Sequence, residues 1–317
     1  MLFGCLASCP TRSRYMDPCT IRLYGNNLTN VDNVFHSGMW SMKRLNLGGN
    51  PYLNVSSNTF SGTMPALTEL SLNDNNFQDL DPYLLKSFRS LYKLCLNGNH
   101  ISNIPRYFLS STRRLKVLEL ADNELTSIEE LFPVNQQHSL KNYVKTIRLD
   151  GNQLKSIRFG ASAKSISHLD LSGNQIYDIG TQDLENLTSS ITLNLAGNPL
   201  VNIDAGCFKK LIHLEKLNLS LIDIKQLNHS VQNIISLEEL ILDNSSLTSI
   251  GKDEFLGSNG LRTISLKNNS LKTVYGAMQN LTNLTSLDLS NNDLTTLTSD
   301  SLPSESNKVK LKSLWME

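Results

Sequence analysis

The sequence predicts a solenoid of stacked repeats, in which every repeat contributes one short strand. Three observations lead to this prediction: an internal period of about 24 residues, an apolar–polar alternation early in each repeat, and an asparagine at the ninth place of most repeats. Self-similarity with a period of about 20 to 50 residues is the sequence mark of repeat architectures. The length of 317 residues alone would suggest two domains, but the repeat overrides that expectation.

The repeat can be followed through its first place, which is apolar in most copies. Successive first places are separated by 22 to 29 residues, most often by 24. They fall at Pro18, Met42, Leu67, Leu91, Leu115, Val144, Ile166, Ser190, Leu214, Leu237, Leu261 and Leu284, and a further repeat begins at Leu311. We therefore expect residues 18–317 to form one array of about 12 to 13 repeats.

The fourth and sixth places predict the strand. They are apolar and enclose a residue of another kind, as in Leu118-Glu119-Leu120. This alternation is the period of a strand with one buried face. Glycine, aspartate or asparagine follows in most repeats, for example at Gly98 and Asp122, and favours the sharp turn that ends a strand.

The asparagine at the ninth place is the most specific feature. A coil that turns inward leaves backbone groups unpaired, and a buried carboxamide offers both donors and acceptors to them. Stacked repeats would align these side chains in a ladder: Asn26, Asn50, Asn75, Asn99, Asn123, Asn152, Asn174, Asn198, Asn269 and Asn292. Ile222 and Ser245 interrupt the ladder, which predicts a weak point, a change of curvature, or a defect covered by water near residues 222–245.

Cysteine is concentrated at the amino end of the chain. Cys5, Cys9 and Cys19 lie within the first 19 residues, whereas Cys95 and Cys207 stand alone inside repeats. Such a cluster favours a disulfide-stapled cap and an oxidising compartment, with three unrelated buried thiols as the alternative. The sequence contains no run of about 20 apolar residues that would span a membrane.

These features together resemble the leucine-rich repeat superfamily, in its typical 24-residue extracellular class that carries recurring phenylalanines such as Phe60, Phe208 and Phe255. The resemblance covers residues 18–317 and implies an α/β horseshoe, with a parallel sheet on the concave face and short helices and turns on the convex face. It also implies that residues 1–17 belong to an N-terminal cysteine cap, with three cysteines where the family usually has four. Because no closing cap follows, we expect the array to be truncated at Glu317.

One repeat, residues 115–143, is about five residues longer than the others. Its segment Ser127-Ile-Glu-Glu130 matches a helix capping box, and Leu131 and Phe132 supply an apolar face. We expect a short helix or a bulging loop near residues 129–143.

A search for catalytic chemistry finds no phosphate-binding loop, zinc spacing or nucleophile motif. His168 and Asp170 are expected on the same face of one strand, where they could hold a metal or form an ordinary surface pair. We expect no cofactor, no metal site and no enzymatic activity in this chain.

The outward places of the strands are therefore the candidate binding surface. They offer Arg22, Tyr24, Lys43, Arg44, Tyr92, Lys93, Lys116, Glu119, Arg148, Asp150, Glu238 and Glu239. This face changes from basic at the amino end to acidic at Glu238 and Glu239. Such a change would steer a ligand of opposite charge asymmetry, although a sheet of this kind needs polar residues in any case. Tyrosine and arginine are frequent binding anchors. The net charge of zero gives no argument for nucleic acid.

Candidate glycosylation sites match the Asn-x-Ser/Thr pattern at Asn27, Asn54, Asn186, Asn228, Asn244, Asn268, Asn280 and Asn283. Asn218 also matches, but a glycan there would block the strand face. The number of sites is close to that expected by chance, so the pattern does not establish secretion.

The sequence predicts a module that binds a protein or peptide ligand, as the extracellular part of a receptor or adhesion protein with any membrane anchor outside this chain. A cytosolic scaffold or regulatory subunit of the same repeat class is the alternative.

Overall fold

The structure, a computed structural model, describes residues 19–32, 34–35, 39–60, 64–132, 144–274, 276–303 and 311–316. The chain divides into two compact units, Met1–Gln153 and Leu154–Glu317, called here the N-terminal and C-terminal units. The expected cap over residues 1–17 lies outside the described residues. Among the described residues, no helical segment has the length and apolar character that a membrane crossing requires.

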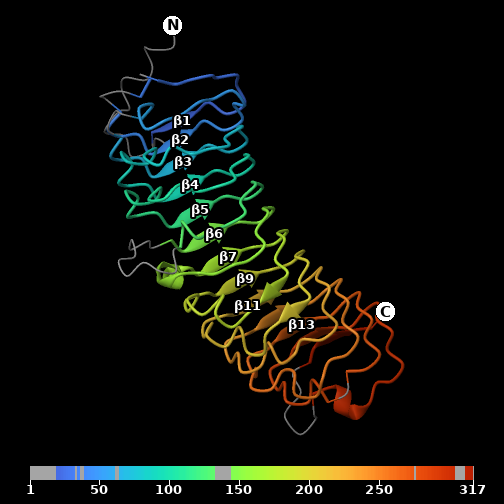
Figure 1. Cartoon of the computed structure of the whole chain (residues 1–317). Coiled ribbons are helices and arrows are strands. Elements are labelled where there is room, and N and C mark those ends of the chain that lie inside the picture. The colour runs from blue at the N-terminus through green and yellow to red at the C-terminus, as the bar shows by residue number, and fades with distance from the viewer. Residues whose placement is uncertain are drawn as a thin grey trace. The chain divides into compact units, whose positions relative to one another are not determined.

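The N-terminal unit is a stack of short parallel strands in chain order (Figure 1). They are β1 (Thr20–Arg22), β2 (Arg44–Asn46), β3 (Glu69–Ser71), β4 (Lys93–Cys95), β5 (Val117–Glu119) and β6 (Thr146–Arg148). Each strand pairs with the next, so that the same place of successive repeats lies opposite, for example Leu45 beside Leu70. The strands occupy the third to fifth places of the repeat.

The C-terminal unit repeats this arrangement (Figure 1). Its main parallel sheet contains β7 (His168–Asp170), β9 (Thr192–Asn194), β11 (Lys216–Asn218), β12 (Glu239–Ile241), β13 (Thr263–Ser265), β14 (Ser286–Asp288) and β15 (Ser313–Trp315). A second parallel pair, β8 (Asp178–Ile179) with β10 (Asn202–Ile203), was not predicted from the sequence. Two 3-10 helices are present, η1 (Ala161–Ser165) and η2 (Ser299–Ser301), and turns make most other connections in the described residues. The predicted parallel-sheet solenoid is confirmed.

The apolar places of the repeat form the core. Leu118 and Leu120, at the fourth and sixth places, are fully buried, and the corresponding leucines and isoleucines of most other repeats are buried as well. Each such side chain contributes about 2 kcal/mol through removal of its surface from water. On the opposite side of the coil, the rings of Phe35, Phe60 and Phe88 contact one another in succession, with centroids 5.9 and 5.2 Å apart. No repeat could bury these residues alone, so neighbouring repeats stabilise one another.

The ninth-place asparagines bind the backbone where the coil turns inward. The Asn123 amide donates to the carbonyl oxygens of Leu96, Leu120 and Ala121, at 2.9 to 3.2 Å, and its oxygen accepts from Ile101 N at 3.1 Å. The members that are buried are Asn50, Asn75, Asn99, Asn123, Asn152, Asn174, Asn198 and Asn269. Asn292 is half-buried, and Asn26, in the first repeat, is exposed although its amide still donates to Leu23 O.

The predicted interruption of the ladder has a visible structure. Ser245 Oγ donates to Leu219 O and accepts from Ile222 N, but at 3.3 and 3.4 Å, longer than most of the asparagine bonds. Ile222 is buried and its side chain offers no polar atom. Its neighbour Leu221 has φ of 57°, a left-handed conformation that glycine or asparagine adopts in most other repeats and that leucine adopts at a cost of about 1 kcal/mol. The two repeats that begin at Leu214 and Leu237 therefore combine longer ladder hydrogen bonds with backbone strain at Leu221.

The long repeat, residues 115–143, is described by the structure only as far as Phe132. Residues 129–131 form a turn, and no helix begins at Ser127 in the part of this repeat that the structure describes. Ser127 Oγ accepts from Glu129 N at 3.2 Å, two residues on, so the capping side chain closes a local turn and starts no helix. Leu131 and Phe132 are buried as expected of an apolar face, and residues 133–143 lie outside the described residues.

Candidate ligand-binding face

The outward places of the strands lie on one exposed face in each unit. In the N-terminal unit, Arg22, Tyr24, Lys43, Tyr92 and Arg148 are exposed, whereas Arg44, Lys93, Lys116, Glu119 and Asp150 are partly covered. In the C-terminal unit, Glu238 is exposed and Glu239 is half-buried. The structure thus gathers the predicted residues on two strand faces, one in each unit.

Ion pairs between neighbouring strands neutralise many of the charges on these faces. Arg44 Nε lies 3.1 Å from Glu69 Oε2, and Lys93 Nζ lies 2.6 Å from Glu119 Oε1. Within one repeat, Arg148 pairs with Asp150 at 2.8 Å. In the C-terminal unit, Lys216 pairs with Glu239 at 2.7 Å and Arg262 with Glu238 at 3.3 Å. The pairing reduces the expected change from basic to acidic side chains, while Arg22 and Lys43 form no ion pair among the described residues.

Glu69, Asp74 and Arg262 are residues of this face that sequence reasoning missed. Glu69 lies directly opposite Arg44 in the sheet register, and both occupy the third place of their repeats. Asp74 Oδ2 accepts a hydrogen bond from the Tyr24 hydroxyl at 3.2 Å. The signal was available in the sequence, because comparing the same place in successive repeats shows which charges become neighbours.

Glu119 is the centre of a small polar network. Besides Lys93, its carboxylate accepts from Asn97 Nδ2 at 3.0 Å and from the Cys95 thiol. Burial opposes its ionisation, but the hydrogen bond and charge of Lys93 together with the other two donors hold the pKa of Glu119 below its ordinary value. The same hydrogen bond raises the pKa of Lys93. Both groups are therefore charged at neutral pH.

Cys95 lies beside this network without being reactive. Burial raises the pKa of the Cys95 thiol to about 12, and the negative charge of Glu119 is the second cause of this increase. Burial also raises the pKa of Cys207. Both cysteines are free and buried, and because the thiolate is the nucleophilic form, neither has the environment of a catalytic cysteine.

The strand face of the N-terminal unit is hollowed across β1 to β4. The hollow has a volume of about 340 Å³ and is lined by Thr20, Arg22, Arg44, Leu45, Asn46, Glu69, Leu70, Ser71, Lys93 and Cys95. Two exposed tyrosines, Tyr24 and Tyr92, come from the same strand-bearing segments. A Cβ atom on Gly48 or Gly49 would lie 3.0 or 3.2 Å from the Tyr24 ring, so these glycines leave room for the ring.

The predicted His168–Asp170 pair does not assemble into a metal site. His168 Nδ1 contacts Thr192 Oγ1 at 3.0 Å, and Asp170 Oδ1 accepts from Ser172 N and Oγ at 3.0 and 2.6 Å. No group of three or more metal-binding side chains occurs in the described ranges.

Cys19 is disulfide-bonded, and the two other cysteines of the expected cap, Cys5 and Cys9, lie outside the described residues.

Among the candidate glycosylation sites, the exposed asparagines are Asn27, Asn54, Asn228, Asn244 and Asn280. At the other sites the amide nitrogen is a donor: Asn186 binds Phe159 O, Asn283 binds Asn259 O, and Asn268 binds the Asn244 side chain. Asn218 is half-buried on the strand face, where its oxygen accepts from Ser220 N.

Comparison with known proteins agrees with this architecture. A family model for the leucine rich repeat matches residues 41–101 and 235–294, and a second, the BspA type leucine rich repeat region, matches residues 136–236. Together with the repeat geometry, these matches show that the chain belongs to the leucine-rich repeat superfamily.

Two relatives share about a third of their aligned residues with this chain. Tsukushi of Xenopus tropicalis is 32% identical over 131 residues, which is 40% of this chain and 36% of Tsukushi. Human Toll-like receptor 8 is 30% identical over 138 residues, which is 41% of this chain and 13% of the receptor. The aligned region is thus a small part of either relative.

Solved structures share the fold at lower identity. The glycosylated Toll–Spatzle complex of Drosophila gives a TM-score of 0.75 with 17% identity, over 94% of this chain and 44% of that chain. A TLR13–ssRNA13 complex gives 0.61 with 21% identity, over 87% and 47%. These likenesses show the fold alone.

Proposed function

We propose that this chain is a binding module that recognises a protein or peptide ligand on the strand face of its N-terminal unit. The observation that carries the proposal is the hollow across β1 to β4, which is lined by charged groups and hydroxyls. Two exposed tyrosines, Tyr24 and Tyr92, lie next to β1 and β4 in the same segments. Aromatic side chains with exposed faces are frequent anchors of protein interfaces. We propose no catalytic role, because the thiols and carboxylates of this face are held in unreactive states by their neighbours.

The rigidity of this face supports recognition. Arg44 and Lys93 are already held by Glu69 and Glu119, so little side-chain freedom is lost when a ligand arrives. The paired charges present donors and acceptors in fixed positions, which favours specificity over simple electrostatic attraction.

We place the chain outside the cell, as part of a receptor or adhesion protein. The disulfide at Cys19 supports an oxidising compartment, and the exposed candidate glycosylation sites are compatible with it. The similarity to Tsukushi and to Toll-like receptor 8 points the same way. The cytosolic scaffold is the second candidate, but no structural feature favours it over the first.

The test begins with the secreted chain presented to an array of purified extracellular protein domains. Each binder is then titrated against the Tyr24→Ser/Tyr92→Ser variant. We expect a loss of affinity of at least about tenfold, as for the removal of two interface anchors. The control Tyr83→Ser/Tyr177→Ser removes two tyrosines of similar exposure outside the strands and should leave affinity unchanged. Equal effects of both variants on every binder would contradict the assignment of this face.

A further inference from the structure

The N-terminal unit carries a second surface whose charge is not neutralised. In a protein of zero net charge, residues 82–118 contain seven basic residues and no aspartate or glutamate. The basic residues are Lys86, Arg89, Lys93, Arg106, Arg113, Arg114 and Lys116. Lys93 belongs to the strand face and is paired with Glu119, but three of the others line a separate hollow.

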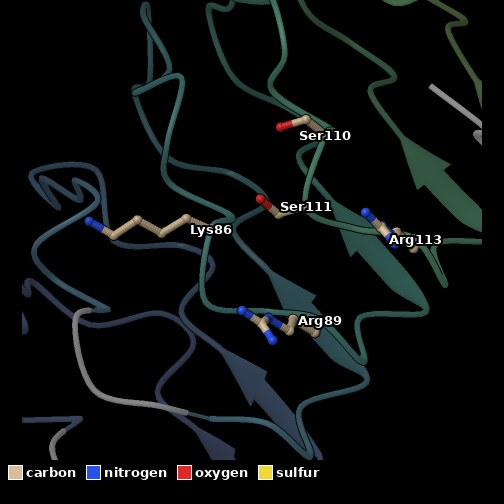
Figure 2. A pocket seen from close by; sticks show the side chains of 5 residues that line it. All are labelled: Lys86, Arg89, Ser110, Ser111 and Arg113. Carbon is tan, nitrogen blue, oxygen red and sulfur yellow. The ribbon is translucent and has the colours of Figure 1, made fainter. Parts of the chain in front are cut away.

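This hollow lies in the connections that precede β4 and β5. It has a volume of about 410 Å³ and is lined by Lys86, Arg89, Ser110, Ser111 and Arg113, here called the basic flank. Figure 2 shows the five side chains, with Arg89, Ser110, Ser111 and Arg113 around the hollow and Lys86 extending outward at its edge. The basic flank shares no lining residue with the hollow on the strand face.

The repeat places the two arginines in register. Arg89 and Arg113 each lie two residues before the first place of their repeats, Leu91 and Leu115, and β4 pairs directly with β5. The backbones at these positions are therefore about one strand spacing, roughly 5 Å, apart. Two arginines at the same place of successive repeats can each bind an anionic group, and together they can hold successive anions along a chain.

Buried neighbours hold the basic flank in place. Leu84, Leu85 and Phe88 are buried on either side of Lys86, and Phe108 and Leu109 are buried directly before Ser110. The turns are closed by backbone hydrogen bonds, from Lys86 N to Tyr83 O at 3.0 Å and from Ser110 N to Tyr107 O at 2.8 Å. The cations are thus displayed on short, well-anchored turns.

No carboxylate pairs with these cations. Among the described residues, none of Lys86, Arg89 and Arg113 forms an ion pair. The nearest acid before them in the sequence, Asp81, accepts from Ser57 N at 2.6 Å and from Tyr83 N at 2.8 Å. These hydrogen bonds, with a smaller contribution from the charge of Lys86, lower the pKa of Asp81, so this carboxylate balances Lys86 in part and leaves the two arginines unbalanced. Three like charges around one hollow repel one another, and a bound anion would remove that repulsion.

We propose that the basic flank binds a sulfated polysaccharide, whose sulfate groups contact Arg89, Arg113 and Lys86 while the hydroxyls of Ser110 and Ser111 donate to sulfate oxygens. The lining contains no aromatic side chain, whereas single-stranded nucleic acids are usually held by bases stacked on aromatic rings. Sulfated polysaccharides are also the polyanions of the extracellular space, in which the Cys19 disulfide is stable. The protein ligand of the strand face and the polysaccharide would bind at the same time.

The experiment uses the whole secreted chain and a heparin dodecasaccharide as the probe, in surface plasmon resonance at several salt concentrations. The Arg89→Gln/Arg113→Gln variant is compared with Lys209→Gln/Lys210→Gln, which removes the same charge from two exposed lysines of the C-terminal unit. Because all four side chains are exposed, both variants should keep the wild-type melting temperature. We expect Kd to rise at least about tenfold in the arginine variant and less than twofold in the lysine variant, with a weaker salt dependence in the arginine variant alone.

Three outcomes would overturn the proposal. Equal weakening in both variants would mean that only net charge matters. Undiminished binding of a fully desulfated oligosaccharide would show that sulfate is not recognised. A single-stranded RNA of equal charge that binds more tightly than heparin, and is lost in the arginine variant, would replace the polysaccharide with nucleic acid. In support of two separate sites, we expect the arginine variant to bind the protein ligand of the strand face as tightly as the wild type does.

Discussion

The asparagine ladder makes a quantitative prediction at Asn123. In Asn123→Ala, Ile101 N loses its acceptor, while the carbonyl oxygens of Leu96 and Leu120 each keep a second donor, from Asn99 and Asn152. The loss is therefore dominated by one stranded buried N–H group, which costs about 1–3 kcal/mol. Partial loss at the carbonyl groups brings the expected destabilisation to about 2–3 kcal/mol.

Urea unfolding followed by far-ultraviolet circular dichroism measures the total effect, and hydrogen exchange localises it. We expect a lower unfolding midpoint and faster exchange at the Ile101 amide. Asn103→Ala is the matched control, because Asn103 is an exposed asparagine in the same repeat as Ile101 and its amide contacts only Ser102 Oγ. It should change stability by less than about 0.5 kcal/mol. A similarly small effect of Asn123→Ala, with unchanged exchange at Ile101, would refute the role of the ladder.

Three further predictions concern the weak repeat and the polar network. Ser245→Asn should raise the free energy of unfolding by about 1 kcal/mol, because a carboxamide reaches backbone groups that the serine hydroxyl holds at 3.3 to 3.4 Å, and destabilisation in urea would contradict this. Leu221→Asn should also stabilise by about 1 kcal/mol, since asparagine tolerates the φ of 57°; an unchanged midpoint would show that the leucine is not strained. Because the pKa of Glu119 is lowered on folding, its stabilising effect is present above the ordinary value of 4.5 and is lost as the pH falls through the folded pKa. Glu119→Gln should therefore flatten the acid limb of a stability–pH profile, and an identical limb in both proteins would contradict the pairing with Lys93.

The repeat architecture could be predicted because each of its determinants is local in sequence and recurs. Leu118 and Leu120 identify a strand, and Asn123 identifies the inward turn, without knowledge of any distant contact. The short strands β8 and β10 were missed because two residues carry no alternation that distinguishes them from a loop. At Ser127 the same residues that match a capping box close a turn, since the side-chain acceptor serves either structure.

The candidate site could be predicted only in part. The period predicts which places of a repeat face outward, but it does not by itself show that Arg44 and Lys93 form ion pairs with the next repeat. The partners Glu69 and Glu119 become visible when the same places of successive repeats are compared. The basic flank lies outside the strand places altogether, in the connections before Leu91 and Leu115. Whether Lys86, Arg89 and Arg113 line one hollow depends on the path of these turns, which the period does not determine.

The most direct test of the central claim is hydroxyl-radical footprinting of the tyrosines with and without the protein ligand. Tyr24 and Tyr92 lie on the proposed binding face, whereas Tyr83, Tyr107 and Tyr177 are similarly exposed outside the strands. If the strand face of the N-terminal unit binds the ligand, oxidation of Tyr24 and Tyr92 falls on binding and that of the other three is unchanged. Protection of Tyr83, Tyr107 or Tyr177, with Tyr24 and Tyr92 still fully oxidised, would contradict it.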